Sequence, residues 1–506
     1  MSLIDGGSFA GHDLASGHDW PIESVVADFD RRGVTAGLVA SWRSLYQDLE
    51  AGNREAAEWG RRFPGRVIPL ALVHPSWYGT SPVELMTWLK TELGFRAVAL
   101  ASTPSYYPVD WRAPAVRALG EAAAGEGMIL QALIATDADL GGVVSAWGDL
   151  ETPVMIRWMA GHRYKYIASE LAAARSCPNL LFDCSTLCST GALELFARRV
   201  GGERIFFAGN APWAIPDCGQ AMLEAANLNS TDRAAIECGN LDEILAWAEP
   251  YSAKVPAAPA LAAVNALALR PKVDIHWHPD HWNLGEPALD DEAQLATLDR
   301  YGIERVIMFS ILALNHSLVE GNAFTAQCCE RNRRAYGMIV IDPLRPKESQ
   351  QELDRWSRHP RFVGIKTIQD VAGLRLDAEE YRPFLEQAER LTLPVLAHLP
   401  GMLEAARRHP SLPFIAAHGN WGRARHLAEQ RNIHFDFSTG HANRHETQLA
   451  RFIEAVGVDR VLFGSDAQLV SPAWSLAKLA AAGLEERTLE RVLRQNAYRL
   501  FPKLAD

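Results

Sequence analysis

Two histidines stand one residue apart in the segment VDIHWHP, residues 273–279, at the end of a short apolar run. Residues i and i+2 of a β-strand point to the same side, about 6.6–6.8 Å apart along the strand. Two imidazoles placed in this way, His276 and His278, can converge on one metal ion with bonds of about 2.0–2.1 Å. The spacing therefore favours a metal site at the end of a strand.

Four more polar side chains end apolar runs in the same part of the chain. They are Lys366 in FVGIK, His398 in PVLAHLP, His418 in FIAAHGN and Asp466 in LFGSDA. Taken singly, a histidine after a strand is more often structural, and an aspartate in GSD can cap a following helix. The metal interpretation depends on the whole set ending strands of one unit.

An internal repeat provides a comparison for these residues. The segment LIDGGSFAG, residues 3–11, aligns with the segment that contains the two histidines, with Asp5 on Asp274. Further on, residues 20–41 align with 289–310, and residues 204–216 align with 460–472. The sequence therefore predicts a tandem repeat of one fold.

The first copy lacks every candidate ligand. The aligned pairs are His276 and Gly7, His278 and Phe9, His398 and Ala132 (or Gln131), His418 and Met159, Lys366 and Ala99, and Asp466 and Asn210. The acids Asp274 and Asp436 persist in the first copy as Asp5 and Asp183, which predicts that they orient strand ends by hydrogen bonds. The joint loss of the other residues predicts a metal site in the second copy alone.

Each copy contains eight short β-rich apolar runs with amphipathic stretches between them. In the second copy the runs lie near 273–278, 305–312, 337–342, 362–368, 393–399, 413–419, 433–438 and 460–466. One stretch, residues 445–457, places Leu449, Phe452, Ile453 and Val456 on one helical face. Eightfold strand–helix alternation is typical of the (β/α)₈ TIM barrel, an α/β fold of about 250 residues whose active sites lie at the carboxyl ends of the strands.

The predicted organisation is therefore two tandem (β/α)₈ barrels. Residues 1–251 form a degenerate barrel without metal ligands, and residues 272–506 form the metal-binding catalytic barrel. The Ala/Pro-rich segment 252–271 is interpreted as the linker. Fusion of two such copies predicts an intramolecular pseudo-dimer, and further homo-oligomers remain open.

The set DIHWH, VLAHLPG, IAAHGN and LFGSDA resembles the amidohydrolase superfamily of metal-dependent hydrolases. More narrowly, it resembles the branch typified by aminocarboxymuconate-semialdehyde decarboxylase. The resemblance covers the whole second copy, and the first copy is similar in pattern only.

The resemblance implies a ligand set and a catalytic residue. His276, His278, His398 and Asp466 would bind one divalent ion, with zinc as the expected metal and Mn²⁺, Fe²⁺ or Co²⁺ as alternatives. His418 would be the catalytic histidine beside it. For Lys366 it implies a carboxylated lysine between two metals, a group that binds a substrate carboxylate, or a buried ion pair.

Such a site predicts a metal-dependent hydrolase that acts on an amide, lactone or other ester bond of a small molecule. A bound divalent ion lowers the pKa of its water from about 15.7 to about 7. Asp466 would accept the proton of that water, and His418 would polarise the carbonyl or share the role of base. One alternative is a decarboxylase of a small aromatic or unsaturated acid, and another is a non-catalytic scaffold stabilised by the ion.

Composition excludes several other classes of function. A formal net charge of −11 over 506 residues predicts no basic patch for nucleic acid. The best apolar run, residues 259–269, is too short to span a membrane. The start MSLIDGG lacks the pattern of a signal peptide, and the seven cysteines show no C-x-x-C spacing. The expected protein is a cytoplasmic enzyme with reduced thiols.

Overall fold

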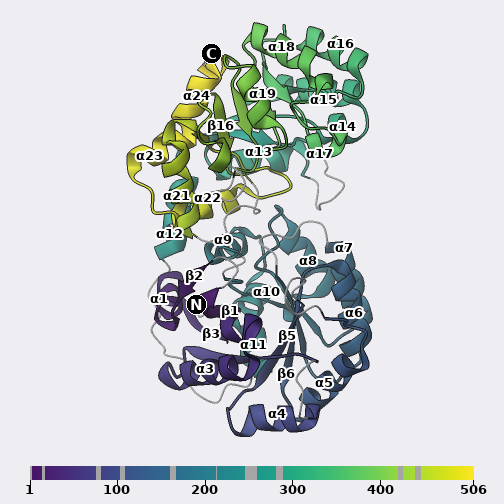
Figure 1. Cartoon of the computed structure of the whole chain (residues 1–506), viewed down its shortest axis with the longest axis vertical. Helices are drawn as coiled ribbons and strands as arrows, with labels where there is room; N and C mark the ends of the chain where they lie inside the picture. The colour runs from purple at the N-terminus through teal and green to yellow at the C-terminus, as the bar shows by residue number, and fades with distance from the viewer. Residues whose placement is uncertain are drawn as a thin grey trace. The chain divides into compact units, whose positions relative to one another are not determined.

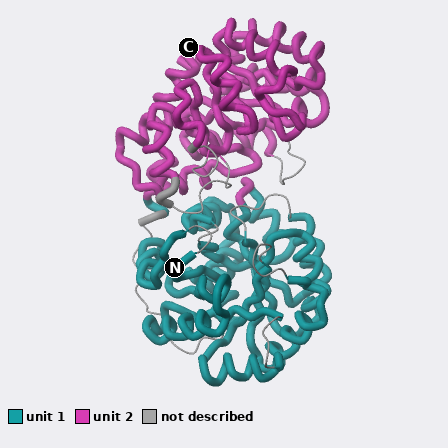
Figure 2. Tube along the Cα trace, in the orientation of Figure 1, with its two compact units in different colours: residues 1–187, 191–262 teal, residues 188–190, 263–506 magenta. Residues whose placement is uncertain are grey.

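The computed structural model describes residues 3–13, 17–75, 81–102, 109–159, 167–211, 214–245, 259–280, 289–419, 425–438 and 446–505. The chain divides into two compact units, one of residues 1–187 with 191–262 and one of residues 188–190 with 263–506 (Figure 2). We call them the N-terminal and the C-terminal barrel. The division falls inside helix α12 (Pro259–Ala268), which lies within the predicted linker, while the predicted domain bounds and the pseudo-dimer stay predictions. None of the helices described is both long and apolar enough to cross a membrane.

The C-terminal barrel contains one sheet in which each strand pairs in parallel with the next. Its strands are β10 (Lys272–Trp277), β11 (Ile303–Met308), β12 (Ala335–Val340), β13 (Phe362–Lys366), β14 (Val395–Ala397), β15 (Phe414–Ala416), β16 (Ile433–Asp436) and β17 (Val461–Leu462). The sheet closes where the amide of Ile275 donates to the carbonyl of Phe463 at 3.1 Å. The predicted barrel is confirmed for this half of the chain.

Helices surround these strands (Figure 1). They are α13 (Asp291–Arg300), α14 (Ile311–Asn315), α15 (Leu318–Arg331), α16 (Pro346–Trp356), α17 (Gln369–Ala372), α18 (Arg382–Leu391), α19 (Met402–Arg408), α21 (Glu446–Val456), α22 (Pro472–Ala481), α23 (Glu486–Glu490) and α24 (Asn496–Leu500). The predicted apolar face of α21 is confirmed, because Leu449, Phe452, Ile453 and Val456 are all buried.

The N-terminal barrel has the same parallel order with one added strand. Its strands are β1 (Leu3–Asp13), β2 (His18–Trp20), β3 (Val34–Ser41), β4 (Val67–Val73), β5 (Ala97–Ala101), β6 (Ile129–Ile134), β7 (Val154–Trp158), β8 (Leu180–Asp183) and β9 (Ile205–Phe206). The short strand β2 pairs antiparallel with β1. The amide of Gly6 donates to the carbonyl of Phe207 at 2.8 Å and closes the sheet.

The helices of this barrel follow its strands in the same alternation. They are α1 (Ile22–Arg32), α2 (Trp42–Tyr46), α3 (Leu49–Arg62), α4 (Pro82–Thr91), α5 (Pro114–Gly125), α6 (Asp137–Trp147), α7 (Ile167–Ser176), α8 (Ala192–Val200), α9 (Pro216–Ala225), α10 (Ser230–Ala234) and α11 (Asn240–Leu245).

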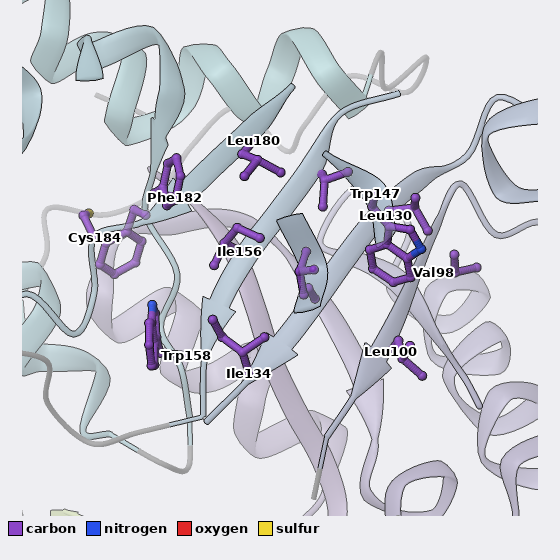
Figure 3. Packing of buried hydrophobic residues seen from close by; sticks show 14 of the residues in the cluster. Val98, Leu100, Leu130, Ile134, Trp147, Ile156, Trp158, Leu180, Phe182 and Cys184 are labelled. Atoms are coloured by element: carbon purple, nitrogen blue, oxygen red, sulfur yellow. The ribbon is translucent and has the colours of Figure 1, made fainter. Parts of the chain in front are cut away.

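Alternation along each strand builds two apolar layers in the N-terminal barrel. On β5, Val98 and Leu100 belong to the layer between strands and helices, whereas Ala97 and Ala99 belong to the layer inside the barrel. Figure 3 shows part of the outer layer, in which Trp147 of α6 lies among strand residues such as Leu130. Buried side chains fill both layers, so the sheet is held rigidly and its strand ends keep fixed positions.

Backbone details agree with the alignment at the strand ends. The amide of Asp466 donates to the carbonyl of His276 at 2.8 Å, and the amide of Asn210 donates to that of Gly7 at 3.1 Å. Asp466 and Asn210 also share a left-handed backbone, with φ of 67° and 53°. The two pairs therefore occupy the same place in their barrels, while the duplication itself stays a prediction.

The same comparison can be made on the strands at the far side of each barrel. Leu130 pairs with Val154 in the N-terminal barrel, and Val395 pairs with Phe414 in the C-terminal barrel. In both cases the amide of the first residue donates to the carbonyl of a proline that precedes the second, at 3.2 and 3.0 Å. These four residues show which positions of β6 and β7 are equivalent to which positions of β14 and β15.

This register corrects two of the aligned pairs. Three residues after Val395 stands His398, which falls on Leu133, and four residues after Phe414 stands His418, which falls on Trp158. The sequence alignment gives Ala132 (or Gln131) and Met159 instead. The sequence alignment is displaced by one residue here because few residue types in β14 and β15 are the same as in β6 and β7. The loss of both histidines from the N-terminal barrel is unaffected.

Candidate metal centre

The predicted site residues all lie at the carboxyl ends of strands in the C-terminal barrel. The ends of these strands hold His276 (β10), His278 (after β10), Lys366 (β13), His398 (after β14), His418 (after β15) and Asp466 (after β17). The side chains of His276, His278, Lys366 and Asp466 are buried, and His398 and His418 are half-buried.

Three of them form a compact group. Oδ1 of Asp466 lies 2.9 Å from Nε2 of His278 and 3.3 Å from Nε2 of His276. Two donor atoms that share one ion at bonds of about 2.0–2.2 Å lie about 3.0–3.5 Å apart when the angle between the bonds is 90° to 110°. The observed spacings match that separation closely. Nitrogen and carboxylate donors of this kind fit a single divalent ion.

A second group overlaps the first. His276, His418 and Asp436 also offer ligand atoms that lie within 4.8 Å of one another. The ring of His418 lies 4.9 Å from the ring of His276 and 5.1 Å from the ring of His398, measured between centroids. The rings of His278, His276, His418 and His398 thus follow one another at centroid distances of 5.4, 4.9 and 5.1 Å, and His398 belongs to neither of the two groups.

The Nδ1 atom of each of these histidines has a partner. These partners are Asp436 Oδ2 for His276 at 2.9 Å, the Phe309 carbonyl for His278 at 3.1 Å, Asp370 Oδ2 for His398 at 2.6 Å, and Ser438 Oγ for His418 at 2.9 Å. A carbonyl or carboxylate partner holds the ring proton on Nδ1, which leaves the Nε2 lone pair for a metal. His276, His278 and His398 are therefore oriented for binding through Nε2.

Charge in the group favours the protonation states that a metal needs. Burial lowers the pKa of His276, although the carboxylates of Asp436 and Asp466 oppose that fall. Burial and the neighbouring histidines hold the pKa of His418 well below its ordinary value. Burial opposes ionisation of Asp466, yet the neighbouring histidines outweigh it and lower its pKa. At neutral pH His276 and His418 are therefore neutral imidazoles, and Asp466 is a carboxylate.

Lys366 stands beside this group without joining it. Its side chain is fully buried, and Nζ makes no hydrogen bond to any residue that the structure describes. Nζ lies 4.8 Å from the centre of the Phe309 ring. Burial lowers the pKa of Lys366 to about 8, against the pull of Asp436 and Asp466. An amine in this state is a ready partner for an anionic group that enters the site.

The two acids expected to be structural do hold strand ends. Asp274 accepts hydrogen bonds from the amides of His276 and Ser465, both at 3.1 Å. Asp436 accepts from the amides of His418 and Ser438 at 3.1 and 3.0 Å. Asp436 also fixes the ring of His276, a role that the sequence alone does not indicate.

Two further residues around the site are missed by the sequence reasoning. Ser438 contacts the ring of His418, but a serine also stands at the matching position of the first copy, as Ser185, so comparison of the copies cannot single it out. Asp370 contacts the ring of His398, and the first copy has Thr103 in its place. Its loss together with the histidine is a signal that could have identified it.

Of the histidines His281, His316, His441 and His445, the structure describes one. His281, His441 and His445 lie outside the described residues. His316 is exposed at the end of α14, where its carbonyl accepts from Nη1 of Arg345 at 3.4 Å.

Comparison with known proteins agrees with the second half of the chain. Residues 260–503 match a family model described as amidohydrolase, and this match falls on the C-terminal barrel. No curated protein matches the chain.

Solved structures that resemble the chain cover slightly less than half of it. One is 2,6-dihydroxybenzoate decarboxylase from Rhizobium, with 18% identity, 46% of this chain, 99% of that chain and a TM-score of 0.39. Another is 5-carboxyvanillate decarboxylase from Novosphingobium aromaticivorans in complex with manganese. It has 18% identity, the match covers 46% of this chain and 96% of that chain, and the TM-score is 0.39. A third is 4-oxalomesaconate hydratase from Rhodopseudomonas palustris. It has 16% identity, the match covers 46% of this chain and 96% of that chain, and the TM-score is 0.37.

Proposed function

We propose that the C-terminal barrel is a metal-dependent enzyme that hydrolyses an amide, lactone or other ester bond of a small molecule. The observation that carries the proposal is the buried group of His276, His278 and Asp466, with donor atoms 2.9 and 3.3 Å apart. The match of residues 260–503 to the amidohydrolase model supports the same class.

The ion would be held by His276, His278 and Asp466, with His398 as the fourth ligand. Zinc is the proposed metal, and Mn²⁺, Fe²⁺ and Co²⁺ accept the same kinds of donor atom. When bound, such an ion supplies an acidified water at neutral pH. The described site contains no sulfur ligand, which is consistent with all four of these metals.

Two residues are assigned to proton transfer. Asp466 is ionised at neutral pH because neighbouring histidines lower its pKa, so it can accept a proton from water and pass it to the leaving group. His418 is neutral because burial lowers its pKa, and Ser438 contacts its Nδ1 at 2.9 Å. Its Nε2 is therefore available to polarise a carbonyl or to accept a proton.

One observation favours a second candidate, the non-oxidative decarboxylation of a small carboxylic acid. Lys366 is a buried amine with no hydrogen bond among the described residues, beside the proposed ligands. Such a group can bind a substrate carboxylate at the site. His418 would then exchange a proton with carbon instead of with oxygen.

The experiment that tests the proposal begins with metal content. Purified wild-type protein should hold one divalent ion per chain, and the His276→Ala/His278→Ala protein should hold none. His316→Ala is the matched control, because this histidine is exposed and belongs to neither group of candidate ligands. Wild-type protein without metal, or equal occupancy in the double variant, contradicts the proposal. Two ions per chain would instead favour a carboxylated Lys366.

The reaction is then identified with the metal-loaded wild type. Amides, lactones and aromatic carboxylates are screened in parallel, with release of acid and of carbon dioxide as the two readouts. Acid release that the His276→Ala/His278→Ala protein lacks supports hydrolysis. Release of carbon dioxide with no acid from any ester or amide favours the second candidate. Activity that survives in the metal-free double variant contradicts both.

A further inference from the structure

The N-terminal barrel holds a buried arginine near the place where the C-terminal barrel gathers its histidines. Arg157 on β7 is fully buried. Its Nε lies 3.2 Å from Oδ1 of Asn210, and its Nη1 lies 3.3 Å from Oε1 of Gln131. Burial of a guanidinium is unfavourable by several kcal/mol unless nearby charges and hydrogen bonds offset it. A fold that buries an arginine therefore needs opposite charges or hydrogen-bond acceptors close to its guanidinium.

The backbone shows where this guanidinium lies relative to the metal centre of the other barrel. Gly7 and Asn210 take the places of His276 and Asp466, as their matching amide–carbonyl bonds show. A Cβ atom built on Gly7 would lie only 2.1 Å from Nη1 of Arg157. The guanidinium therefore fills the space in which a side chain at the position of His276 would begin.

The charges around Arg157 explain why a cation is kept there. Asp5 and Asp183 are fully buried, like their counterparts in the C-terminal barrel. Burial lowers the pKa of Arg157 to about 10, and the charges of Asp5 and Asp183 oppose that fall. The group is thus charged at neutral pH. A second cation, Arg32, approaches Asp5 with Nη2 at 3.6 Å.

The contacts of the neighbours fix the guanidinium in place. Nε2 of Gln131 donates to the carbonyl of Gly6 at 2.8 Å, which leaves its Oε1 turned toward Arg157. Nδ2 of Asn210 donates to the carbonyl of Trp158 at 2.7 Å, which leaves its Oδ1 for Nε. Asn210 replaces an aspartate of the other barrel, so an amide oxygen meets the guanidinium where a carboxylate would meet a metal.

We propose that the guanidinium of Arg157 is a built-in cation that takes the place of the metal ion in the N-terminal barrel. The barrel then balances its buried carboxylates with its own side chains and excludes a divalent ion from the same space. Its stability does not depend on metal, whereas that of the C-terminal barrel does. This inference rests on the metal site proposed for the C-terminal barrel, and it does not depend on which reaction that site performs.

The first test removes the charge in the full chain. Arg157→Met keeps much of the volume, and Arg43→Met is the matched control because Arg43 is exposed on α2. Loss of one partner from a buried charge cluster should lower the melting temperature of the N-terminal barrel by about 5–10 °C, and hydrogen exchange should assign the loss to residues 3–245. Metal affinity of the chain should not change. An N-terminal barrel as stable as wild type overturns the proposal.

The second test needs no destabilised protein. Chelation of divalent ions from wild-type protein should lower the melting transition of the C-terminal barrel and leave that of the N-terminal barrel unmoved. Arg157→Lys, which keeps the charge, should be more stable than Arg157→Met, and millimolar guanidinium ion should stabilise Arg157→Ala but not wild type. An N-terminal barrel that loses stability on chelation, or an Arg157→Lys protein no better than Arg157→Met, overturns the proposal.

Discussion

The two barrels are most alike where carboxylates hold strand ends and most different in the side chains that project between those ends. Asp5 accepts from the amides of Gly7 and Gly209 at 2.8 and 2.6 Å. Asp274 makes the corresponding bonds to the amides of His276 and Ser465 at 3.1 Å. The same acid thus joins the first strand to the segment after the last one in both barrels. An acid that persists without a metal site is part of the scaffold.

The difference between the barrels concerns charge and donor atoms. The C-terminal barrel offers imidazoles and a carboxylate that fit an added cation. The N-terminal barrel offers glycine, phenylalanine and asparagine at the matching positions and places a guanidinium among them. In this fold, therefore, the residues that hold the strand ends together differ from the residues that offer ligand atoms, although both stand at the same strand ends. Substitutions in one barrel can be judged against the other.

The largest expected effect is the loss of turnover on substitution of His418, a residue that the N-terminal barrel lacks. His418→Asn should retain the metal and lose turnover by about 10²–10⁴-fold, because the proposed proton-transfer group is removed while the four proposed metal ligands remain. Metal content and kcat are measured on the same preparation. Loss of metal with no further loss of rate would show that His418 is a ligand, and its assigned role would be wrong.

A smaller effect is expected from Asp370, whose Oδ2 lies 2.6 Å from Nδ1 of His398. Partners of this kind orient the ring of a ligand and typically change metal affinity by about 10–100-fold. Asp370→Asn should weaken metal binding by that factor, and Asp370→Glu should recover part of it. Glu379→Gln, an exposed acid paired with Arg382, is the control. Equal affinity in Asp370→Asn and wild type would remove Asp370 from the site.

Much of this comparison could be predicted from the sequence, since strand ends and apolar runs leave a periodic trace. The pairs of His276 with Gly7 and of Asp466 with Asn210 agree with backbone hydrogen bonds. Arg157 was not predicted, because a lone arginine on an apolar strand has no partner nearby in sequence. Gln131 reaches it from β6 and Asn210 from the segment after β9, 26 and 53 residues away in the sequence. Closure of the barrel, which no local pattern encodes, brings them together.

Gly7 offers a sharper test of how firmly Arg157 is held. A Cβ at this position would lie 2.1 Å from Nη1 and 2.5 Å from Cζ of Arg157. Gly7→Ala should destabilise the N-terminal barrel by about 1–3 kcal/mol, as overpacking of a filled interior does. The measurement is chemical denaturation of the full chain.

Two comparisons decide whether the clash is the cause of that loss. Gly141→Ala is the control, because Gly141 lies in α6 and a Cβ added there would meet no atom within 4 Å, so the change should be neutral or stabilising. Gly7→Ala with Arg157→Ala should cost less than the sum of the two single changes, since the double variant has no clash. Additive losses would mean that Arg157 moves aside freely.

The smallest expected effect concerns pH and His434 on β16. His434 pairs with Ile415 in the C-terminal barrel, as Leu181 pairs with Met155 in the other. Its Nδ1 makes no hydrogen bond within the described residues. Burial first, and then the charges of Arg460 and Arg499, lower its pKa to about 4. His434 is therefore neutral in the folded protein at pH values where the unfolded chain would protonate it.

The sign of the effect follows from that difference in pKa. Between its ordinary pKa of 6.5 and the folded value of about 4, the unfolded chain binds a proton that the folded chain does not. The C-terminal barrel should therefore lose stability as the pH falls through this window, by about 1 kcal/mol between pH 6.5 and pH 5.5. His434→Leu installs the residue of the N-terminal barrel and should remove this part of the acid dependence. Denaturation is measured with chelator present, so that metal release does not add its own proton uptake, and His316→Leu is the control. If His434→Leu and wild type lose stability in parallel over this range, His434 is protonated in the folded protein and the assigned pKa is wrong.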